Sequence, residues 1–380
     1  MRKGLYGRLF SLFFVTWAVY SIVFSQLIPF LHSIGYSENQ ISWMLTASAL
    51  IGMITQLLVG YWLDKYQKTK VFFVGLIIAV SALSSIAYSV SHLNFWLLFF
   101  MVSIFVALFR VSSNVAETWV YQIDDEVMSR FGIIRIFGSI GWAIASIVVA
   151  SMIERYNYFS IMPIVLVLTI IILFLCVNIP DSEKVSTANS LNFRDIKILL
   201  ANKQYLLGLW FFFILFMIYN FDGITGIYKM IELGSSNSLI GFKWFAQAIV
   251  EIPLMALGAK LIIKLSNRSV SLFTAIFMGL RFILYGLATT PEQMVWISLL
   301  QAFTFPTMLL AQKDYVAKTV PIELRSSGHM IMTAITSNIP VILVPLISNM
   351  VSGFVSNSQI LLVSGLLCFV PILLLKDVKI

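Results

Sequence analysis

Long runs of apolar residues, separated by short polar segments, dominate this chain of 380 residues. A helix needs about 20 apolar residues to cross a bilayer. The pattern predicts about twelve such spans, at residues 9–31, 40–62, 71–91, 95–121, 132–153, 158–179, 205–228, 238–259, 270–289, 293–312, 327–352 and 357–375. Membrane strands would alternate over short segments, whereas residues 71–90 and 161–179 are almost continuously apolar. We therefore expect an all-α membrane protein.

The composition excludes a soluble globular domain, because 59% of the residues are hydrophobic and only 11% are charged. The mean hydropathy is +0.94. The first apolar run follows Arg2, Lys3 and Arg8, as in a signal peptide. It is too long and aromatic for one and lacks a small-residue cleavage site, so we expect it to remain as a span.

Basic residues fall in alternate loops between the predicted spans. Of the 25 Lys and Arg residues, 19 lie in one set of loops, four lie within spans, and only Arg155 and Lys229 lie in the other set. The positive-inside rule then predicts a multi-pass protein of the cell's inner (plasma) membrane with both termini cytoplasmic. Basic loops also account for the net charge of +8 without nucleic acid as a partner.

One long polar stretch divides the chain into two similar halves. Residues 181–204 are predicted to form a cytoplasmic linker between an N-terminal six-helix bundle at 1–180 and a C-terminal one at 205–380. Near-equal halves joined on the cytoplasmic side are typical of transporters built from two parallel repeats.

The loop after the second span carries a motif. Gly60-Tyr-Trp-Leu-Asp64-Lys65 resembles the loop signature of the major facilitator superfamily, although Gln67 stands where that signature has its second Gly and Thr69 replaces a basic residue. The resemblance implies two six-helix bundles and a gating latch at Gly60, Asp64 and Lys65. The alternative is an ordinary basic loop that obeys the topology rule.

Seven ionisable residues interrupt the apolar spans: Arg110, Glu117, Arg135, Asp222, Lys243, Glu251 and Arg281. A charge at the centre of a membrane is costly unless it faces water or an opposite charge, so these residues indicate a transport route. Cys176 and Cys368 lie in apolar spans and the three histidines lack ligand spacing. We therefore expect no disulfide, no metal and no cofactor, with a proton as the coupling ion.

Two helical faces collect polar groups. Arg110, Asn114 and Glu117 recur on one face of the fourth span, and Arg135, Ser139 and Trp142 recur on one face of the fifth. A carboxylate, a guanidinium and an indole suit a polyhydroxylated solute, because the first two bind hydroxyls and the ring stacks on a sugar. The alternative is that Glu117 and Arg135 only hold two helices together.

The same segments resemble a known family. Asn114-Val-Ala-Glu117, with Arg135 18 residues after Glu117 and Gly138-Ser139-Ile-Gly141-Trp142 beyond it, is similar to the lactose permease family of oligosaccharide:proton symporters. The resemblance implies that Glu117 and Arg135 bind sugar and that Trp142 stacks on it. We include Ser139, Asn114, Arg110 and Gln301 in the predicted substrate site.

The second half resembles the phenylpropionate and nucleoside permeases at Glu251-Ile-Pro-Leu, Gly279-Leu-Arg281 and Leu300-Gln301. That resemblance implies roles for Glu251 and Arg281 in ligand binding and proton coupling. The His/Glu pair of lactose permease is missing, because Gln301 and Thr304 stand there. We predict that a coupling set transfers the proton: Asp222, Glu251, Arg281 and Lys243. The alternative is that Asp222 forms a static ion pair with Arg281 or with Lys243.

These features predict a monomeric proton-coupled symporter, not an enzyme, that alternates access in membrane lipids and carries a small polar organic solute, above all a sugar or glycoside. No phosphate-binding Gly-rich motif for ATP occurs. Arg110 and the missing His/Glu pair also suit an exporter of drugs or amphiphilic compounds. The remaining alternatives are an importer of a nucleoside or aromatic acid and a receptor that transports nothing.

Overall fold

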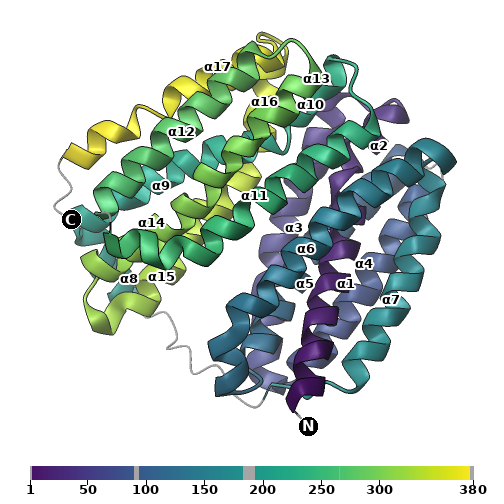
Figure 1. Cartoon of the computed structure of the whole chain (residues 1–380), viewed down its shortest axis with the longest axis horizontal. Helices are drawn as coiled ribbons and strands as arrows, with labels where there is room; N and C mark the ends of the chain where they lie inside the picture. Colours follow the sequence, from purple (N-terminus) through teal and green to yellow (C-terminus); the bar gives the residue numbers. More distant parts are fainter. Residues whose placement is uncertain (1, 90–93, 183–192, 265, 377–380) are drawn as a thin grey trace. The chain divides into compact units, whose positions relative to one another are not determined.

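The computed structural model describes residues 2–89, 94–182, 193–264 and 266–376 (Figure 1). Every regular element in these residues is helical. They are α1 (Arg2–Ser25), α2 (Leu27–Ser33), α3 (Glu38–Tyr66), α4 (Thr69–Ser89), α5 (Phe95–Tyr121), α6 (Asp125–Tyr156), η1 (Tyr158–Ser160), α7 (Ile161–Val177), α8 (Phe193–Ala201), α9 (Lys203–Asp222), α10 (Thr225–Glu232), α11 (Asn237–Lys264), α12 (Asn267–Leu287), α13 (Pro291–Ser298), η2 (Leu299–Phe303), α14 (Phe305–Thr319), η3 (Ile322–Leu324), α15 (Arg325–Thr333), the π-helical η4 (Ala334–Asn338), α16 (Ile339–Ser352), α17 (Asn357–Leu367) and η5 (Pro371–Lys376).

Eleven helical segments of the described residues are long and apolar enough to cross a membrane, and a twelfth, Asn357–Leu373, is apolar but shorter. The prediction of an all-α, multi-pass membrane protein is confirmed. The seventh span runs from Lys203 to Glu232 and is longer than predicted. Lys229 therefore lies inside a span and not in a loop, which corrects its predicted place.

Four spans are interrupted, and a proline or a glycine lies near each interruption. Pro29, Pro306 and Pro340 lack the N–H that would bond to the carbonyl four residues earlier, near the breaks between α1 and α2, η2 and α14, and η4 and α16. Between α9 and α10 the helix stops at Asp222 and Gly223. These breaks expose backbone polar groups inside otherwise regular membrane helices.

Two compact units divide the described chain. The first contains α1 to α7 together with Ser236–Ile249, the first part of α11. In it α1 packs on α6 and α7, while α5 packs on α3 and α4. A Cβ at Gly241 would lie 2.3 Å from the carbonyl oxygen of Ser146, so α11 and α6 approach backbone to backbone.

The second unit contains α8, α9, α10 and the described residues from Val250 onward. In it α12 packs against α17, where a Cβ on Gly365 would lie 2.6 Å from the backbone nitrogen of Ile283. The predicted linker, 181–204, lies partly outside the described residues. Its last part forms α8 and the start of α9.

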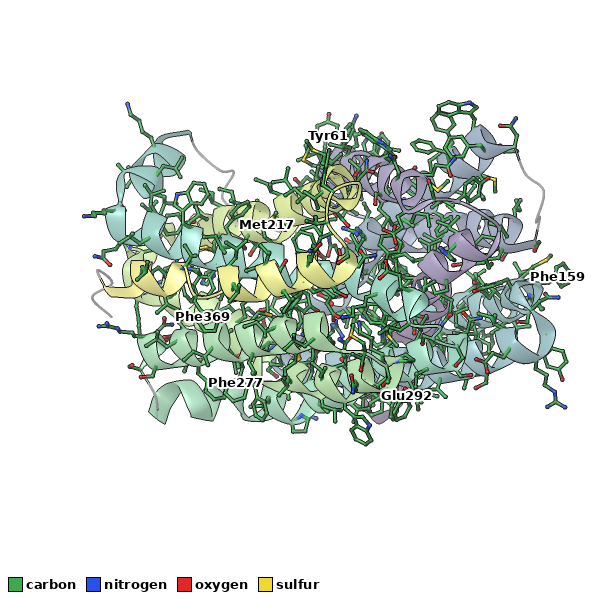
Figure 2. The ribbon with its side chains drawn as sticks, turned by 90° about the horizontal axis from the view of Figure 1, so that it is seen from above. Tyr61, Phe159, Met217, Phe277, Glu292 and Phe369 are labelled. Atoms are coloured by element: carbon green, nitrogen blue, oxygen red, sulfur yellow. The ribbon has the colours of Figure 1, made fainter. Side chains whose placement is uncertain are left out.

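Large apolar side chains cover much of the outer surface. The labelled rings of Tyr61 and Phe159 point outward in Figure 2 and are 62% and 56% exposed. Exposed rings of this kind suit contact with lipid and would be costly in water. The surface thus agrees with a protein that spans the membrane.

Candidate functional site

In the first unit, α5 and α6 bring Glu117 and Arg135 together. Nε of Arg135 donates to Oε1 of Glu117 at 2.7 Å, and a terminal nitrogen of Arg135 donates to the hydroxyl of Ser139 at 3.3 Å. Both charged side chains are 39% exposed. The pair is therefore only half-buried, and its remaining hydrogen-bonding positions are open to a polar solute.

An indole from α1 completes this cluster, and sequence reasoning missed it. The guanidinium of Arg135 lies 4.8 Å from the ring centre of Trp17, a cation–π distance. A Cβ at Gly138 would lie 3.0 Å from the same ring, so Gly138 leaves the room that Trp17 occupies. Trp17 lies in the first apolar run, and nothing in the sequence indicates that this run packs against α6.

Trp142, the predicted stacking residue, lies among other aromatic rings. Its ring centre is 6.4 Å from that of Phe24 and 6.3 Å from that of Trp244, and its carbonyl accepts a hydrogen bond from Ser21. The side chain is half-buried. Trp142 thus presents part of its ring within the first unit and is held by its neighbours.

Arg110 and Asn114 lie on the same face of α5 as Glu117. The amide nitrogen of Asn114 donates to Oε1 of Gln56 on α3 at 3.2 Å, a partner that sequence reasoning missed. Arg110 is half-buried and Asn114 is exposed. The face therefore offers amide and guanidinium donors along the helix.

The second unit holds a buried hydrogen-bonded network centred on Arg281 of α12. Its guanidinium donates to Asp222 at 2.5 Å, to the hydroxyl of Thr304 at 3.3 Å and to Gln301. It also donates to the hydroxyl of Tyr285 at 3.2 Å. Arg281 is fully buried and the Asp222 side chain is 5% exposed. Of the options for Asp222, the structure contains the pair with Arg281.

Gln301 extends this network to Glu251. Its amide nitrogen donates to Oε1 of Glu251 at 2.7 Å and to the hydroxyl of Tyr219 at 3.2 Å. Gln301 lies on η2, between the helices of the broken tenth span, and Asp222 is the last residue of α9. Two interrupted spans therefore place the polar groups around Arg281.

Lys243 belongs to the first unit, whereas Glu251 belongs to the second. The ammonium of Lys243 lies 4.7 Å from the ring centre of Trp244, and the side chain is fully buried. Of the predicted coupling set, Asp222, Glu251 and Arg281 therefore belong to the second unit and Lys243 to the first.

The loop after α3 explains one departure from the major facilitator signature. Gln67 caps α3 with φ at 52°, the left-handed conformation that glycine adopts most easily. Asp64 and Lys65 are exposed, and Asp64 forms no ion pair with any described residue. The backbone N–H of Lys70 instead donates to Asp181 at 2.8 Å, which ties the loop to the end of the sixth span.

Lys229 has a clear structural role. Its ammonium donates to the carbonyl oxygens of Tyr285 and Gly286, at 2.7 Å each, and the residue is 1% exposed. These carbonyls belong to the last turn of α12, where helical hydrogen bonds run out, and the backbone N–H of Ala288 reaches Tyr285 only at 3.4 Å. Lys229 therefore caps α12 and is accounted for without a solute.

Comparisons with known proteins agree with this architecture. The sequence model of the MFS_1 like family matches residues 6–359. An uncharacterised transporter, YwbF of Bacillus subtilis (strain 168), is 23% identical over 312 residues, which cover 79% of this chain and 74% of YwbF.

Solved structures share the fold at low identity. A mutant of the nucleoside transporter NupG is 16% identical, with a TM-score of 0.83 over 99% of this chain and 100% of that one. A POT family transporter in complex with a thioalcohol-conjugated peptide is 12% identical, with a TM-score of 0.74 over 98% and 95% of the two chains.

Proposed function

Because the chain belongs to the MFS_1 like family, whose relatives and structural neighbours are transporters and not enzymes, we propose that it is a proton-coupled symporter. Its solute is a small polar organic molecule, above all a sugar or glycoside, moved by alternating access. The chain acts as a monomer in the lipids of the inner (plasma) membrane, with both termini cytoplasmic.

The observation that carries the substrate assignment is the half-exposed pair of Glu117 and Arg135 beside Trp17. Surface pairs contribute little net stability, so this one is poorly explained as a fastener between helices. A carboxylate and a guanidinium next to an indole bind the hydroxyls and the apolar face of a sugar.

The network around Arg281 supports proton coupling. Protonation of Asp222 would remove the charge that balances the guanidinium. Gln301 connects that pair to the half-buried Glu251, which gives a second carboxylate that can take up a proton and alter the same hydrogen bonds. Asp222 and Glu251 are the proton carriers in this proposal, and Arg281 responds to their charge.

The test uses purified protein in liposomes that contain a pH-sensitive dye, with lactose, melibiose, methyl glucosides and nucleosides added outside. We expect at least one glycoside to enter and carry protons inward. Glu117→Gln and Arg135→Gln should abolish the uptake that the wild type shows. Arg155 is an exposed arginine at the end of α6, so Arg155→Gln should leave uptake unchanged.

Glu251→Gln separates transport from coupling. We expect it to exchange solute across the membrane while it loses the proton movement that accompanies net uptake. Solute entry without proton movement in the wild type would contradict coupling. Unchanged uptake by Glu117→Gln would contradict the assigned site.

A nucleoside is the second candidate solute. The observation that favours it is the fold shared with NupG, a nucleoside transporter, at a TM-score of 0.83. A nucleoside also presents ribose hydroxyls and an aromatic base, which an ion pair and indoles can bind. Uptake of nucleosides in preference to every glycoside in the panel would replace the first assignment with this one.

A further inference from the structure

Arg110 lies near the middle of α5. Glu117, the carboxylate of the same helix, pairs with Arg135 of α6 and not with Arg110. Within the described part of the chain its guanidinium has no ion pair, hydrogen bond or ring contact. A charge at this depth requires water or an anion, because an isolated arginine at the centre of a membrane helix is costly.

The other two guanidiniums of the spans each have a carboxylate and further partners within the protein. Arg135 binds Glu117 and Ser139 and lies over Trp17. Arg281 binds Asp222, Gln301, Thr304 and Tyr285. The protein thus builds acceptors for two arginines and leaves the third without one in its described residues.

Arg110 is also placed to act together with the sugar-type cluster. It precedes Glu117 by seven residues, two helical turns on the same face and about 10 Å along the axis. Asn114 lies between them and bonds to Gln56. Arg110 and Asn114 lie on the accessible side of α5, whereas Val111 and Val115 are buried.

The ionisable residues of the two predicted spans at 95–121 and 132–153 do not balance in charge. Two guanidiniums, Arg110 and Arg135, accompany the single carboxylate of Glu117, which leaves one positive charge. A carboxylate on the solute would supply the missing negative charge, and a guanidinium binds a carboxylate through two parallel hydrogen bonds.

We infer that, among the small polar solutes of the proposed function, the preferred one is an organic anion whose carboxylate binds Arg110, while its polar body binds Glu117 and Arg135. This inference rests on the proposed transport function and adds a substrate class to it. A sugar acid and an aromatic carboxylate share this chemistry, and the experiment distinguishes them.

The test measures binding to the purified full-length protein by its thermal stabilisation, with pairs of solutes that differ in charge. The pairs are glucuronate and glucose, gluconate and glucitol, and phenylpropionate and phenylpropanol. We expect the anion of at least one pair to bind the wild type at least tenfold more tightly than its neutral partner. The pair that responds identifies the source of the carboxylate.

Arg110→Gln keeps hydrogen-bond donors but removes the charge. We expect it to lose at least tenfold in affinity for the anion and to keep the affinity for the neutral partner, whereas Arg110→Lys retains most of the preference. A merely structural role would change both affinities alike. Arg155→Gln is the matched control, because this arginine is exposed at the end of α6.

Two outcomes overturn the inference. Equal binding of anion and neutral partner by the wild type does so without any variant, and an unchanged preference in Arg110→Gln does so with one. Uptake of neutral glycosides by a wild type that shows no preference for the anion of any pair would overturn the anion site and leave the transport function standing. No binding or uptake of any solute would count against both.

Discussion

Arg135 and Arg281 each pair with a carboxylate, but their surroundings differ. The side chains of Arg135 and Glu117 are each 39% exposed, whereas Arg281 is fully buried. An exposed pair contributes about 0–1 kcal/mol. A buried pair is costly to break, because the remaining charge has no water. We therefore expect changes in the first unit's pair to affect transport and changes in the second unit's pair to affect stability as well.

The buried pair gives a prediction about unfolding. Asp222→Asn leaves Arg281 without its carboxylate and should destabilise the protein by about 3–5 kcal/mol. The double variant with Arg281→Gln removes both charges and should recover a large part of this loss. Thermal unfolding in detergent measures each change, and Glu117→Gln is the control with a small effect. Equal stability of the single and double variants would contradict the role of the pair.

The sequence identified the charged residues but not all of their partners. The periodicity placed Glu117 and Arg135 each on the polar face of its own helix, and the structure shows the two side chains paired. Their assignment to solute binding stays a prediction. Trp17 and Gln56 were missed because each comes from a span distant in sequence. A pattern of apolar and polar positions shows which face of a helix is polar, but not which helix lies opposite it.

At the scale of single helices, close packing determines how near two helices can approach. On α6, a Cβ at Gly141 would lie 2.1 Å from the carbonyl oxygen of Phe14, whereas Gly132 of the same helix has no atom within 4 Å. Backbone atoms cannot give way as the end of a flexible side chain can. The approach of α1 to α6 therefore depends on Gly141.

We expect Gly141→Ala to cost about 1–3 kcal/mol through overpacking. Gly132→Ala should be neutral or slightly stabilising, since alanine favours helix interiors over glycine by about 1 kcal/mol. The two variants make the same chemical change in one helix, so their difference in melting temperature isolates the packing. A stable Gly141→Ala protein would mean that α1 and α6 can move apart.

Lys229 gives the corresponding prediction for a helix end. Lys229→Met keeps an apolar stem but removes the ammonium that donates to the carbonyls of Tyr285 and Gly286, so that Tyr285 keeps only the 3.4 Å bond from the N–H of Ala288. Leaving buried acceptors unpaired should cost about 1–3 kcal/mol, measured by thermal unfolding. Lys318→Met is the control, because Lys318 is 43% exposed and pairs with Asp314 at the surface. Equal losses in both variants would contradict the capping role.

At the scale of elements, the apolar runs predicted the helices but not where they break. The spans are interrupted near Pro306 and Pro340, yet α11 and α16 continue through Pro253 and Pro345. Proline always removes one hydrogen bond, but whether the helix breaks depends on what its neighbours offer the freed carbonyl. That information lies in the packing and not in the local sequence.

For the whole molecule, the proposed orientation can be tested with introduced thiols. The native Cys176 and Cys368 are 2% and 0% exposed, so they contribute little background. Glu292, labelled in Figure 2 at the start of α13, is exposed and lies in a predicted outer loop. Lys65 is exposed and lies in a predicted cytoplasmic loop.

We expect Glu292→Cys to react with a membrane-impermeant maleimide on intact cells. Lys65→Cys should react only after the membrane is permeabilised, because basic loops remain on the cytoplasmic side. Labelling with the opposite sidedness would reverse the proposed orientation and place both termini outside the cytoplasm.

The first part of α11 has a consequence for the integrity of the protein. Although Ser236–Ile249 follows the linker in sequence, it packs within the first unit. There the backbone and hydroxyl of Ser238 donate to Glu154 at 2.8 and 2.5 Å, and Tyr158 donates to Asn237 at 3.1 Å. A protease that cut the linker would therefore leave the two fragments interlocked. We expect a protein cut in the linker to elute as one species in gel filtration. An intact linker would then not be needed to keep the two fragments together.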